Sequence, residues 1–145
     1  MTLVTLCLAF VAAGIGPAGL VAQNRPDFSG AWIDASAGGV LTVKHDGTAL
    51  TFKYEPFSQV VVNMDGTQTV MPLPDGNVLL VKAAWQGSRL VVTYYLPEAK
   101  QDIRRQTWQM AGDGQLVIET EFFGPAMGGP GLKQSPPTKD VFKRR

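Results

Sequence analysis

Four turn dipeptides that end in glycine divide this chain into short runs of alternating polarity, and their spacing strongly constrains the fold. They are Asp46-Gly47, Asp65-Gly66, Gln86-Gly87 and Asp113-Gly114. The central positions of tight hairpin turns favour a positive φ, which glycine adopts without steric cost. The intervals between runs are too short for the crossovers that join parallel strands. The pattern therefore predicts antiparallel strands joined in chain order, as an up-and-down meander.

The runs between these turns have the length of strands, and each places apolar side chains on one face. We expect strands near residues 28–34, 40–45, 48–55, 59–64, 67–71, 78–85, 89–96, 102–110, 116–123 and 139–145. Alternation along the third run, for example, puts Leu50, Phe52 and Tyr54 on the same face. Pro72 and Pro74 exclude a central strand at their position, because proline has no amide hydrogen to donate. The sequence thus predicts an all-β fold, a small closed barrel of about eight to ten strands.

The composition fits one domain with a single core. The chain has 145 residues, of which 45% are hydrophobic, and we expect one barrel domain over residues 23–145. Sixteen glycines and ten prolines exceed average usage, as expected for many short strands joined by tight turns. The formal net charge is +1, so no basic excess marks a nucleic-acid surface, and we expect no nucleic-acid partner.

Residues 1–22 resemble a signal peptide. They carry no charged side chain, and the apolar run from Leu3 to Ala13 has the length of a signal-peptide core. Small residues follow, so cleavage is expected after Ala22 or, as a second option, after Ala18. The segment lacks the usual basic residues near its start, which leaves a retained membrane anchor as the alternative. We expect an exported protein, secreted or periplasmic, that contacts a membrane only if this segment is not cleaved.

The opening of the first strand, Phe28-Ser29-Gly30-Ala31-Trp32, places an aromatic anchor next to a glycine. Alternation turns Phe28, Gly30 and Trp32 to one face. Burial of a tryptophan removes about 150–250 Å² from water, enough for one ring to fix the position of a strand. A glycine inside a strand usually marks a bend or the close approach of another group to the backbone. We therefore expect Trp32 in the core, with a second group packed close to Gly30.

This Phe28-x-Gly30-x-Trp32 opening resembles the first strand of the calycins, which include the lipocalins and the fatty-acid-binding proteins. The chain from Pro26 to Arg144 looks like a group of small exported bacterial barrels of uncharacterised function. In calycins the tryptophan forms the floor of the barrel, and an arginine from the last strand lies across its ring. The resemblance implies these roles for Trp32 and for Arg144, or Arg145 in another register. Such a cation–π contact would join the first strand to the last and close the sheet.

The run from Arg104 to Met110 predicts a polar group inside the barrel. If Trp108 and Met110 face inward, alternation turns Arg104 and Gln106 inward as well. A buried guanidinium without a partner costs several kcal/mol, so something must pair with it. One hypothesis is an interior that holds a polar or anionic head group near Arg104 and Gln106. The apolar walls of such a site would be Tyr54, Tyr94, Trp108 and Phe122.

The other hypothesis for this run needs no ligand. Arg104 would then lie at the rim in water, or pair with a carboxylate, while side chains fill the small barrel. An interior volume measured in a structure distinguishes the two hypotheses.

Little in the sequence points to catalysis. His45 is the only histidine, so any Ser-His-Asp relay would need it, and no cluster has the spacing of metal ligands. Cys7, the only cysteine, lies in the N-terminal segment, so the domain has no thiol. Gly14 to Gly19 match Gly-x-Gly-x-x-Gly, but Pro26 and a strand follow where a dinucleotide site needs a helix. We expect no catalytic residue, no metal and no cofactor.

Three functions remain. The first is an exported, non-enzymatic barrel that holds a small, partly hydrophobic or amphipathic molecule in its mouth, with residues 124–137 as a lid. The second is a structural or partner-binding domain with a solid core, which presents an apolar patch to another envelope protein. The third is a small-barrel enzyme, which a cavity holding His45 or a carboxylate with a raised pKa would favour.

Overall fold

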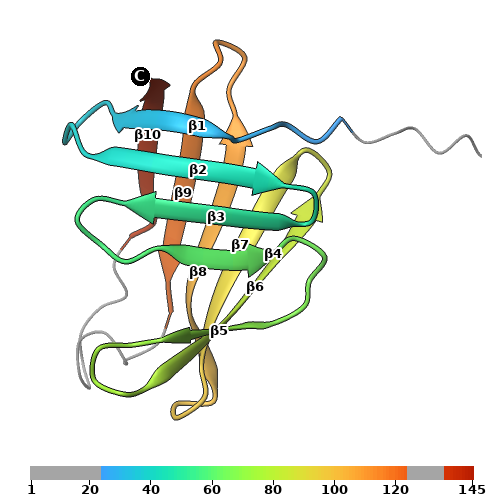
Figure 1. Cartoon of the computed structure of the whole chain (residues 1–145), viewed down its shortest axis with the longest axis vertical. Helices are drawn as coiled ribbons and strands as arrows, with labels where there is room; N and C mark the ends of the chain where they lie inside the picture. The colour runs from blue at the N-terminus through green and yellow to red at the C-terminus, as the bar shows by residue number, and fades with distance from the viewer. Residues whose placement is uncertain (1–23, 124–135) are drawn as a thin grey trace, which may run out of the picture.

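The computed structural model describes residues 24–123 and 136–145, which form one antiparallel sheet of ten strands (Figure 1). The strands are β1 (Gly30–Asp34), β2 (Val40–Asp46), β3 (Ala49–Tyr54), β4 (Val60–Asn63), β5 (Thr69–Pro72), β6 (Val78–Gln86), β7 (Arg89–Leu96), β8 (Gln101–Met110), β9 (Leu116–Phe122) and β10 (Thr138–Arg144). The predicted all-β, up-and-down meander is therefore confirmed. Within the described ranges no helix is long and apolar enough to span a membrane.

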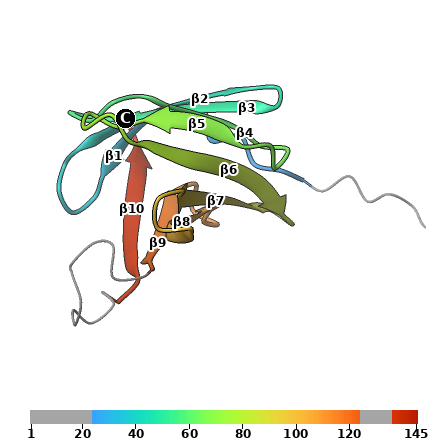
Figure 2. The same ribbon diagram turned by 90° about the horizontal axis from the view of Figure 1, so that it is seen from below.

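The sheet follows chain order except where the first strand meets the last. Its order is β4-β3-β2-β1-β10-β9-β8-β7-β6-β5, so β1 lies between β2 and β10. Figure 1 shows β1 to β4 crossing β7 to β10 at a steep angle. Seen from below in Figure 2, the sheet curls so that β2–β5 lie on one side and β7–β9 on the other. The interior between these two layers is the core.

The barrel is nearly closed where the ends of the sheet approach each other. β4 and β5 are the edge strands, and β5 pairs with β6 alone. Just after β4, Asp65 forms an isolated bridge with Ala84 of β6, and the amide of Gly66 donates to the Ala83 carbonyl at 2.8 Å. Pro72 is the last residue of β5, as expected for a proline at a sheet edge. The seam is the line along which the edge strands β4 and β5 approach each other. One end of this seam is joined by hydrogen bonds near Asp65, whereas β5 does not pair with β4 at the other end.

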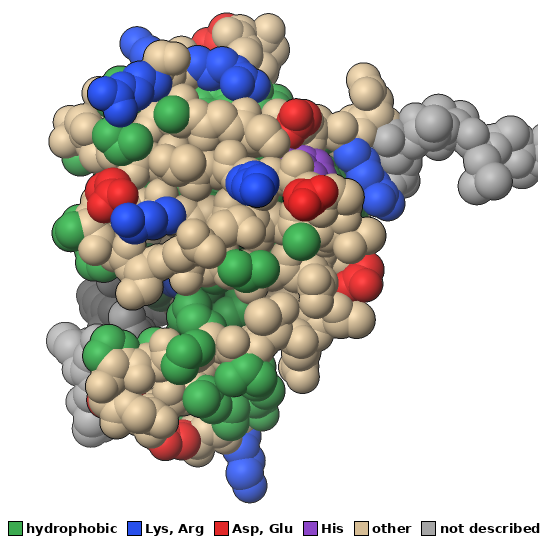
Figure 3. Space-filling model, in the orientation of Figure 1, with side chains coloured by type: hydrophobic (Ala, Val, Ile, Leu, Met, Phe, Trp, Pro, Cys, Tyr) green, Lys and Arg blue, Asp and Glu red, His purple; other side chains and the backbone are tan. Residues whose placement is uncertain are grey.

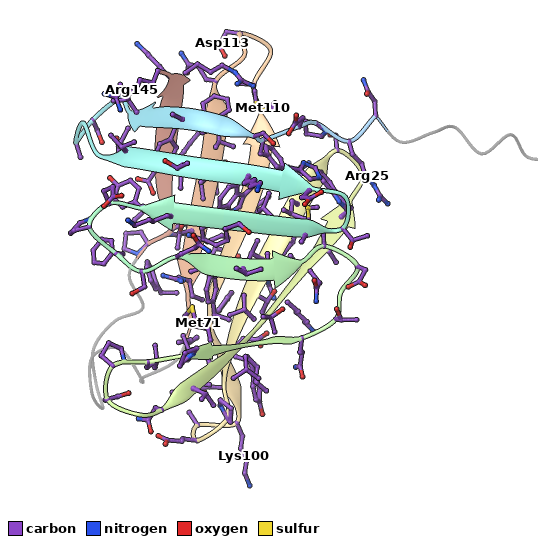
Figure 4. All side chains as sticks on the ribbon, viewed as in Figure 1. Arg25, Met71, Lys100, Met110, Asp113 and Arg145 are labelled. Atoms are coloured by element: carbon purple, nitrogen blue, oxygen red, sulfur yellow. The ribbon has the colours of Figure 1, made fainter. Side chains whose placement is uncertain are left out.

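The inward faces of the strands supply one continuous apolar core. Its largest fully buried side chains are those of Trp32, Trp108, Tyr94 and Phe28. From the edge strand β5, Met71 packs against this core in a half-buried position (Figure 4). The alternation that predicted inward residues on each run is therefore seen in the packing.

Phe28 fills one end of the barrel. It is completely buried, stacks on Trp85 with ring centroids 5.7 Å apart, and meets the edge of Trp108 at 5.9 Å. Its carbonyl accepts a hydrogen bond of 2.9 Å from Nε1 of Trp32. The segment before β1 therefore packs into the barrel, and the interior beyond it is closed from this side.

Arg144 lies over Trp32 at the junction of the first and last strands. The two residues are paired in the β1–β10 register, and the guanidinium carbon is 4.6 Å from the centroid of the indole ring. Nη1 of Arg144 donates to the Ser29 carbonyl at 3.1 Å. The register assigns this position to Arg144, while the backbone amide of Arg145 donates to Ala31. Trp32 and Arg144 thus take the positions that the calycin resemblance implied.

Two expectations fall outside the described residues. The signal segment expected at residues 1–22 is one of them, and most of the 124–137 loop is the other.

Candidate functional site

The barrel contains a cavity of about 340 Å³ between the two layers of the sheet. At its rim are the exposed residues Phe57 and Ser58, from the connection between β3 and β4. The other lining residues are Asp34, Leu41, Phe52, Tyr54, Val60, Tyr94, Arg104, Gln106, Trp108, Ile118, Asp140 and Phe142. On the face shown in Figure 3, hydrophobic side chains gather in the furrow between β4 and β5. The cavity is thus apolar over much of its wall and carries polar groups on two sides.

One polar side is formed by β7 and β8. Tyr94 donates its hydroxyl hydrogen to Oε1 of Gln106 at 3.1 Å. The guanidinium carbon of Arg104 lies 3.7 Å from the centroid of the Tyr94 ring. Burial raises the pKa of Tyr94, although the Arg104 charge acts in the opposite direction, so Tyr94 stays protonated at neutral pH. The amide nitrogen of Gln106 is a further donor on a residue that lines the cavity.

Trp108 adds an unpaired donor to the same side. Its side chain is only 1% exposed, and Nε1 has no hydrogen-bond partner among the residues that the structure describes. The rings of Phe28 and Phe52 contact the indole, with centroids at 5.9 and 5.0 Å, and fix its orientation. An unsatisfied buried donor costs about 1–3 kcal/mol, so native structures rarely leave one without a purpose. Trp108 itself is one of the residues that line the cavity.

A second group of polar residues in the cavity wall begins at the end of β1. Oδ1 of Asp34 accepts hydrogen bonds from the amide and hydroxyl of Ser36, at 2.8 and 2.7 Å, and from the amide of Ala37 at 3.1 Å. Oδ2 accepts one from the Tyr54 hydroxyl at 3.3 Å. Burial acts to raise the pKa of Asp34, but these hydrogen bonds outweigh it and hold the pKa below its usual value. Asp34 is therefore an ionised and fully hydrogen-bonded carboxylate.

Asp140, on β10, is the second carboxyl group in the cavity wall. Among the described residues it makes no hydrogen bond and no ion pair through its side chain. Burial, together with the charge of Asp34, raises the pKa of Asp140 above its usual value. Burial and the same Asp34 charge also raise the pKa of Tyr54. Asp140 is thus a half-buried carboxyl group that is destabilised in its ionised form.

Five of the six residues proposed from the sequence for a ligand site line this cavity: Tyr54, Tyr94, Arg104, Gln106 and Trp108. The sixth, Phe122, lies on β9 opposite Arg104 and is not among the lining residues.

Sequence reasoning missed Asp34 and Asp140. The signal was present, because each lies two residues from an inward-facing position of its strand, Trp32 in one case and Phe142 in the other.

Of the two features that would favour an enzyme, a cavity holding His45 and a cavity carboxylate with a raised pKa, the structure has one. His45 is not among the cavity-lining residues, and its Nδ1 lies 3.5 Å from Oδ1 of Asp27. Asp140, however, is a carboxyl group with a raised pKa inside the cavity. In the described part of the chain, no group of three or more His, Cys, Asp or Glu residues is arranged to hold a metal ion.

No protein-family model and no curated protein matches this sequence. Solved structures do match the barrel. The REP1-NXSQ fatty acid transporter is 11% identical with a TM-score of 0.57, over 81% of this chain and 95% of that one. A point mutant of that transporter is 12% identical with a TM-score of 0.55, over 81% of this chain and 97% of the mutant. The fold is calycin-like. At this identity the similarity of the calycin-like barrel establishes architecture alone.

Proposed function

We propose that this protein binds a small, partly hydrophobic molecule inside its calycin-like barrel, without transforming it. The molecule's polar head would carry hydrogen-bond acceptors, as a carboxylate does, and lie at Arg104, Gln106 and Trp108. The observation that carries the proposal is a cavity of about 340 Å³ lined by Arg104, Gln106 and Trp108 together with apolar side chains. Cavities that hold small ligands combine an apolar wall with a few convergent polar groups, as this one does.

Arg104 supports an acceptor-rich head group because no protein carboxylate neutralises it. All twelve Asp and Glu side chains lie in the described residues, and the ion pairs of these residues involve His45, Lys53 and Arg105 instead. The neighbouring Tyr94 is neutral, and its ring lies against the guanidinium in a cation–π contact. A ligand carboxylate would form charge-assisted hydrogen bonds with the guanidinium, which are about twice as strong as neutral ones.

The apolar wall suits a hydrocarbon body. Leu41, Phe52, Val60, Ile118 and Phe142 line the cavity beside and beyond the polar groups. Each methylene group that a ligand buries there contributes about 0.8 kcal/mol. The structural neighbour is named as a fatty acid transporter, and a ligand of this kind agrees with that name.

The cavity also bears on the alternative of a solid barrel in a structural or partner-binding domain. A cavity of this volume favours an interior ligand, because side chains alone fill many small barrels. Exposed apolar residues do occur at the open seam, at Phe57, Val61, Val70 and Val78. In a partner-binding domain, these residues would form the contact with an envelope partner.

Calorimetric titration with saturated carboxylates from hexanoate to dodecanoate tests the binding function. We expect wild-type protein to bind at least one of them, and quenching of Trp108 fluorescence to accompany binding. Arg104→Gln should weaken binding about tenfold or more, since hydrogen bonds to charged groups contribute about 1.5–3 kcal/mol. Arg89→Gln, at an exposed arginine outside the cavity, is the matched control. Wild-type protein that binds no member of the series, or an Arg104→Gln variant with unchanged affinity, would contradict the proposal.

Asp140 favours a second candidate function, proton transfer within a bound carbonyl compound. Its carboxylate would take a proton from the carbon next to the carbonyl, and a donor in the cavity wall would stabilise the enolate oxygen. Return of the proton to carbon completes an exchange or an isomerisation. Incubation with a bound ketone in D₂O tests this, because the C–H groups should exchange faster with wild-type protein than with Asp140→Asn. Exchange at the buffer rate would leave binding as the function.

We also propose export through residues 1–22. Expression of the full chain followed by N-terminal sequencing should give a protein that begins at Gln23 or Gly19. An intact N-terminus on a membrane-bound protein would instead show a retained anchor.

A further inference from the structure

Two opposite charges in the cavity wall have no charged partner within residues 24–123 and 136–145. The described residues include every Asp and Glu of the chain, and none of these forms an ion pair with Arg104. Asp140 likewise forms no ion pair with a described Lys or Arg, yet both residues line the same cavity. Isolated half-buried charges are costly, and a direct pair would reduce that cost. The fold instead holds these two apart in the wall of a cavity that a small molecule can occupy.

The strand register fixes how far apart they are. Arg104 lies four residues before Trp108 on β8, while Trp108 pairs with Ile118 on β9 and Ile118 pairs with Asp140 on β10. With about 3.4 Å per residue and about 4.8 Å between strands, the two Cα atoms are roughly 17 Å apart along the sheet. Both side chains reach into the cavity and so bring the charges nearer to each other. That separation corresponds to a medium-length hydrocarbon spacer.

Asp34 does not compete for the position at Asp140. Its carboxylate already accepts hydrogen bonds from Ser36, Ala37 and Tyr54. Asp34 therefore adds a negative potential to this side of the cavity, while the oxygens of Asp140 remain available as acceptors. A positively charged donor placed there would be attracted by both carboxylates and bound by one.

Trp108 lines the same cavity, and its Nε1 has no hydrogen-bond partner among the described residues. It is a donor on a side chain that is almost completely buried. Trp108 lies on the strand of Arg104, and it is level with Asp140 two strands away, with Ile118 of β9 between them. An acceptor in the middle or at the anionic end of a bound molecule would satisfy Nε1 of Trp108.

We infer that Asp140 forms a second polar subsite, which binds the protonated amine of a ligand whose carboxylate lies at Arg104. The inference rests on the proposed function and narrows its ligand class to small zwitterionic amphipaths, such as ω-amino carboxylates. A plain fatty carboxylate would satisfy Arg104 and leave Asp140 facing hydrocarbon. An ω-amino carboxylate of the right length would satisfy both ends.

A matched ligand series tests the inference on the wild-type protein. Octanoate, octylamine and 8-aminooctanoate share one chain length and differ only in their ends, and the 4-, 6- and 12-carbon amino acids vary the spacer. We expect the best ω-amino carboxylate to bind about tenfold tighter than the plain carboxylate of equal length, as a charge-assisted contact provides. Without a subsite the order reverses, because an ammonium group buried in an apolar cavity weakens binding.

Substitution at Asp140 tests whether the amino group of the ligand binds at this residue. In Asp140→Asn the advantage of the amino group should disappear, while octanoate binds at least as well as before. Arg104→Gln should weaken both carboxylates and leave octylamine unchanged. Asp46→Asn is the matched control, because Asp46 is exposed, lies outside the cavity and precedes a glycine before which asparagine is equally favoured.

The outcomes separate the two claims. If octanoate binds but no amino group improves binding at any length, the Asp140 subsite is wrong and the proposed function stands. If the amino group helps equally in wild-type protein and Asp140→Asn, the amine binds elsewhere and the inference is also wrong. If no carboxylate of either series binds, the proposed function itself fails.

Discussion

The guanidinium of Arg144 lies against the indole of Trp32, with 4.6 Å between the guanidinium carbon and the ring centroid. The contact joins β10 to β1, so the last strand of the meander holds the first in place. Gly30 makes it possible, because its φ of 136° is one that L side chains rarely adopt and a Cβ there would lie 2.8 Å from Nη1 of Arg144. The positions of Gly30, Trp32 and Arg144, from the two ends of the domain, thus depend on one another.

This dependence predicts non-additive effects of substitution. Gly30→Ala should destabilise the fold by about 1–3 kcal/mol, from backbone strain and from displacement of the guanidinium. Arg144→Ala should cost about 0.5–1 kcal/mol, the value of an exposed cation–π contact. In the double variant the steric part of the glycine substitution disappears, so the loss should be smaller than the sum of the single losses. Urea melts of the four proteins measure this, and strict additivity would show that Gly30 and Arg144 act independently.

Trp32 itself should matter more than either neighbour. It is fully buried and donates a hydrogen bond to the Phe28 carbonyl, so Trp32→Ala leaves a cavity and an unpaired carbonyl. We expect a loss of about 3–5 kcal/mol in the free energy of unfolding. Phe57→Ala, at an exposed aromatic residue, should change stability by less than about 0.5 kcal/mol. Coincident denaturant melts of wild type and Trp32→Ala would refute the structural role of this ring.

The strands were predictable because their signals are local. Turn dipeptides and two-residue alternation indicate each strand without reference to its partners, and alternation alone grouped Arg104, Gln106 and Trp108 on one face of β8. The acidic side of the cavity depends on how distant strands pair. Asp34 and Asp140 come together only because β1 lies beside β10, and no local pattern marks the cavity space between them.

Ser36 should support the charge of Asp34 in a pH-dependent way. Asp34 has a folded pKa below its usual 3.8, after the hydrogen bonds from Ser36 and its neighbours offset burial. A depressed acid pKa stabilises the fold above the unfolded value, and this contribution is lost as the pH falls through the folded value. Ser36→Ala removes one of these bonds and should cost about 1 kcal/mol at neutral pH. Thermal melts at pH 7 and pH 3 measure the difference in stability between wild type and Ser36→Ala, which should be smaller at pH 3. An equal loss of stability at both pH values would show that the hydroxyl acts by packing.

Asp140 should show the opposite dependence. Burial and the Asp34 charge raise its folded pKa above the unfolded value of 3.8, so the folded protein takes up this proton first as the pH falls. The group's stabilising contribution is therefore present below 3.8 and lost as the pH rises through the folded pKa. Asp140→Asn keeps the size of the side chain without the charge, so the variant should be more stable than wild type at pH 7, and the difference should vanish toward pH 3. Asp46→Asn should show no such trend. Chemical denaturation of the three proteins across this pH range measures the effect. A wild type more stable than Asp140→Asn at pH 7 would mean that a cation within the protein already pairs with this carboxylate. That cation would also occupy the proposed amine subsite.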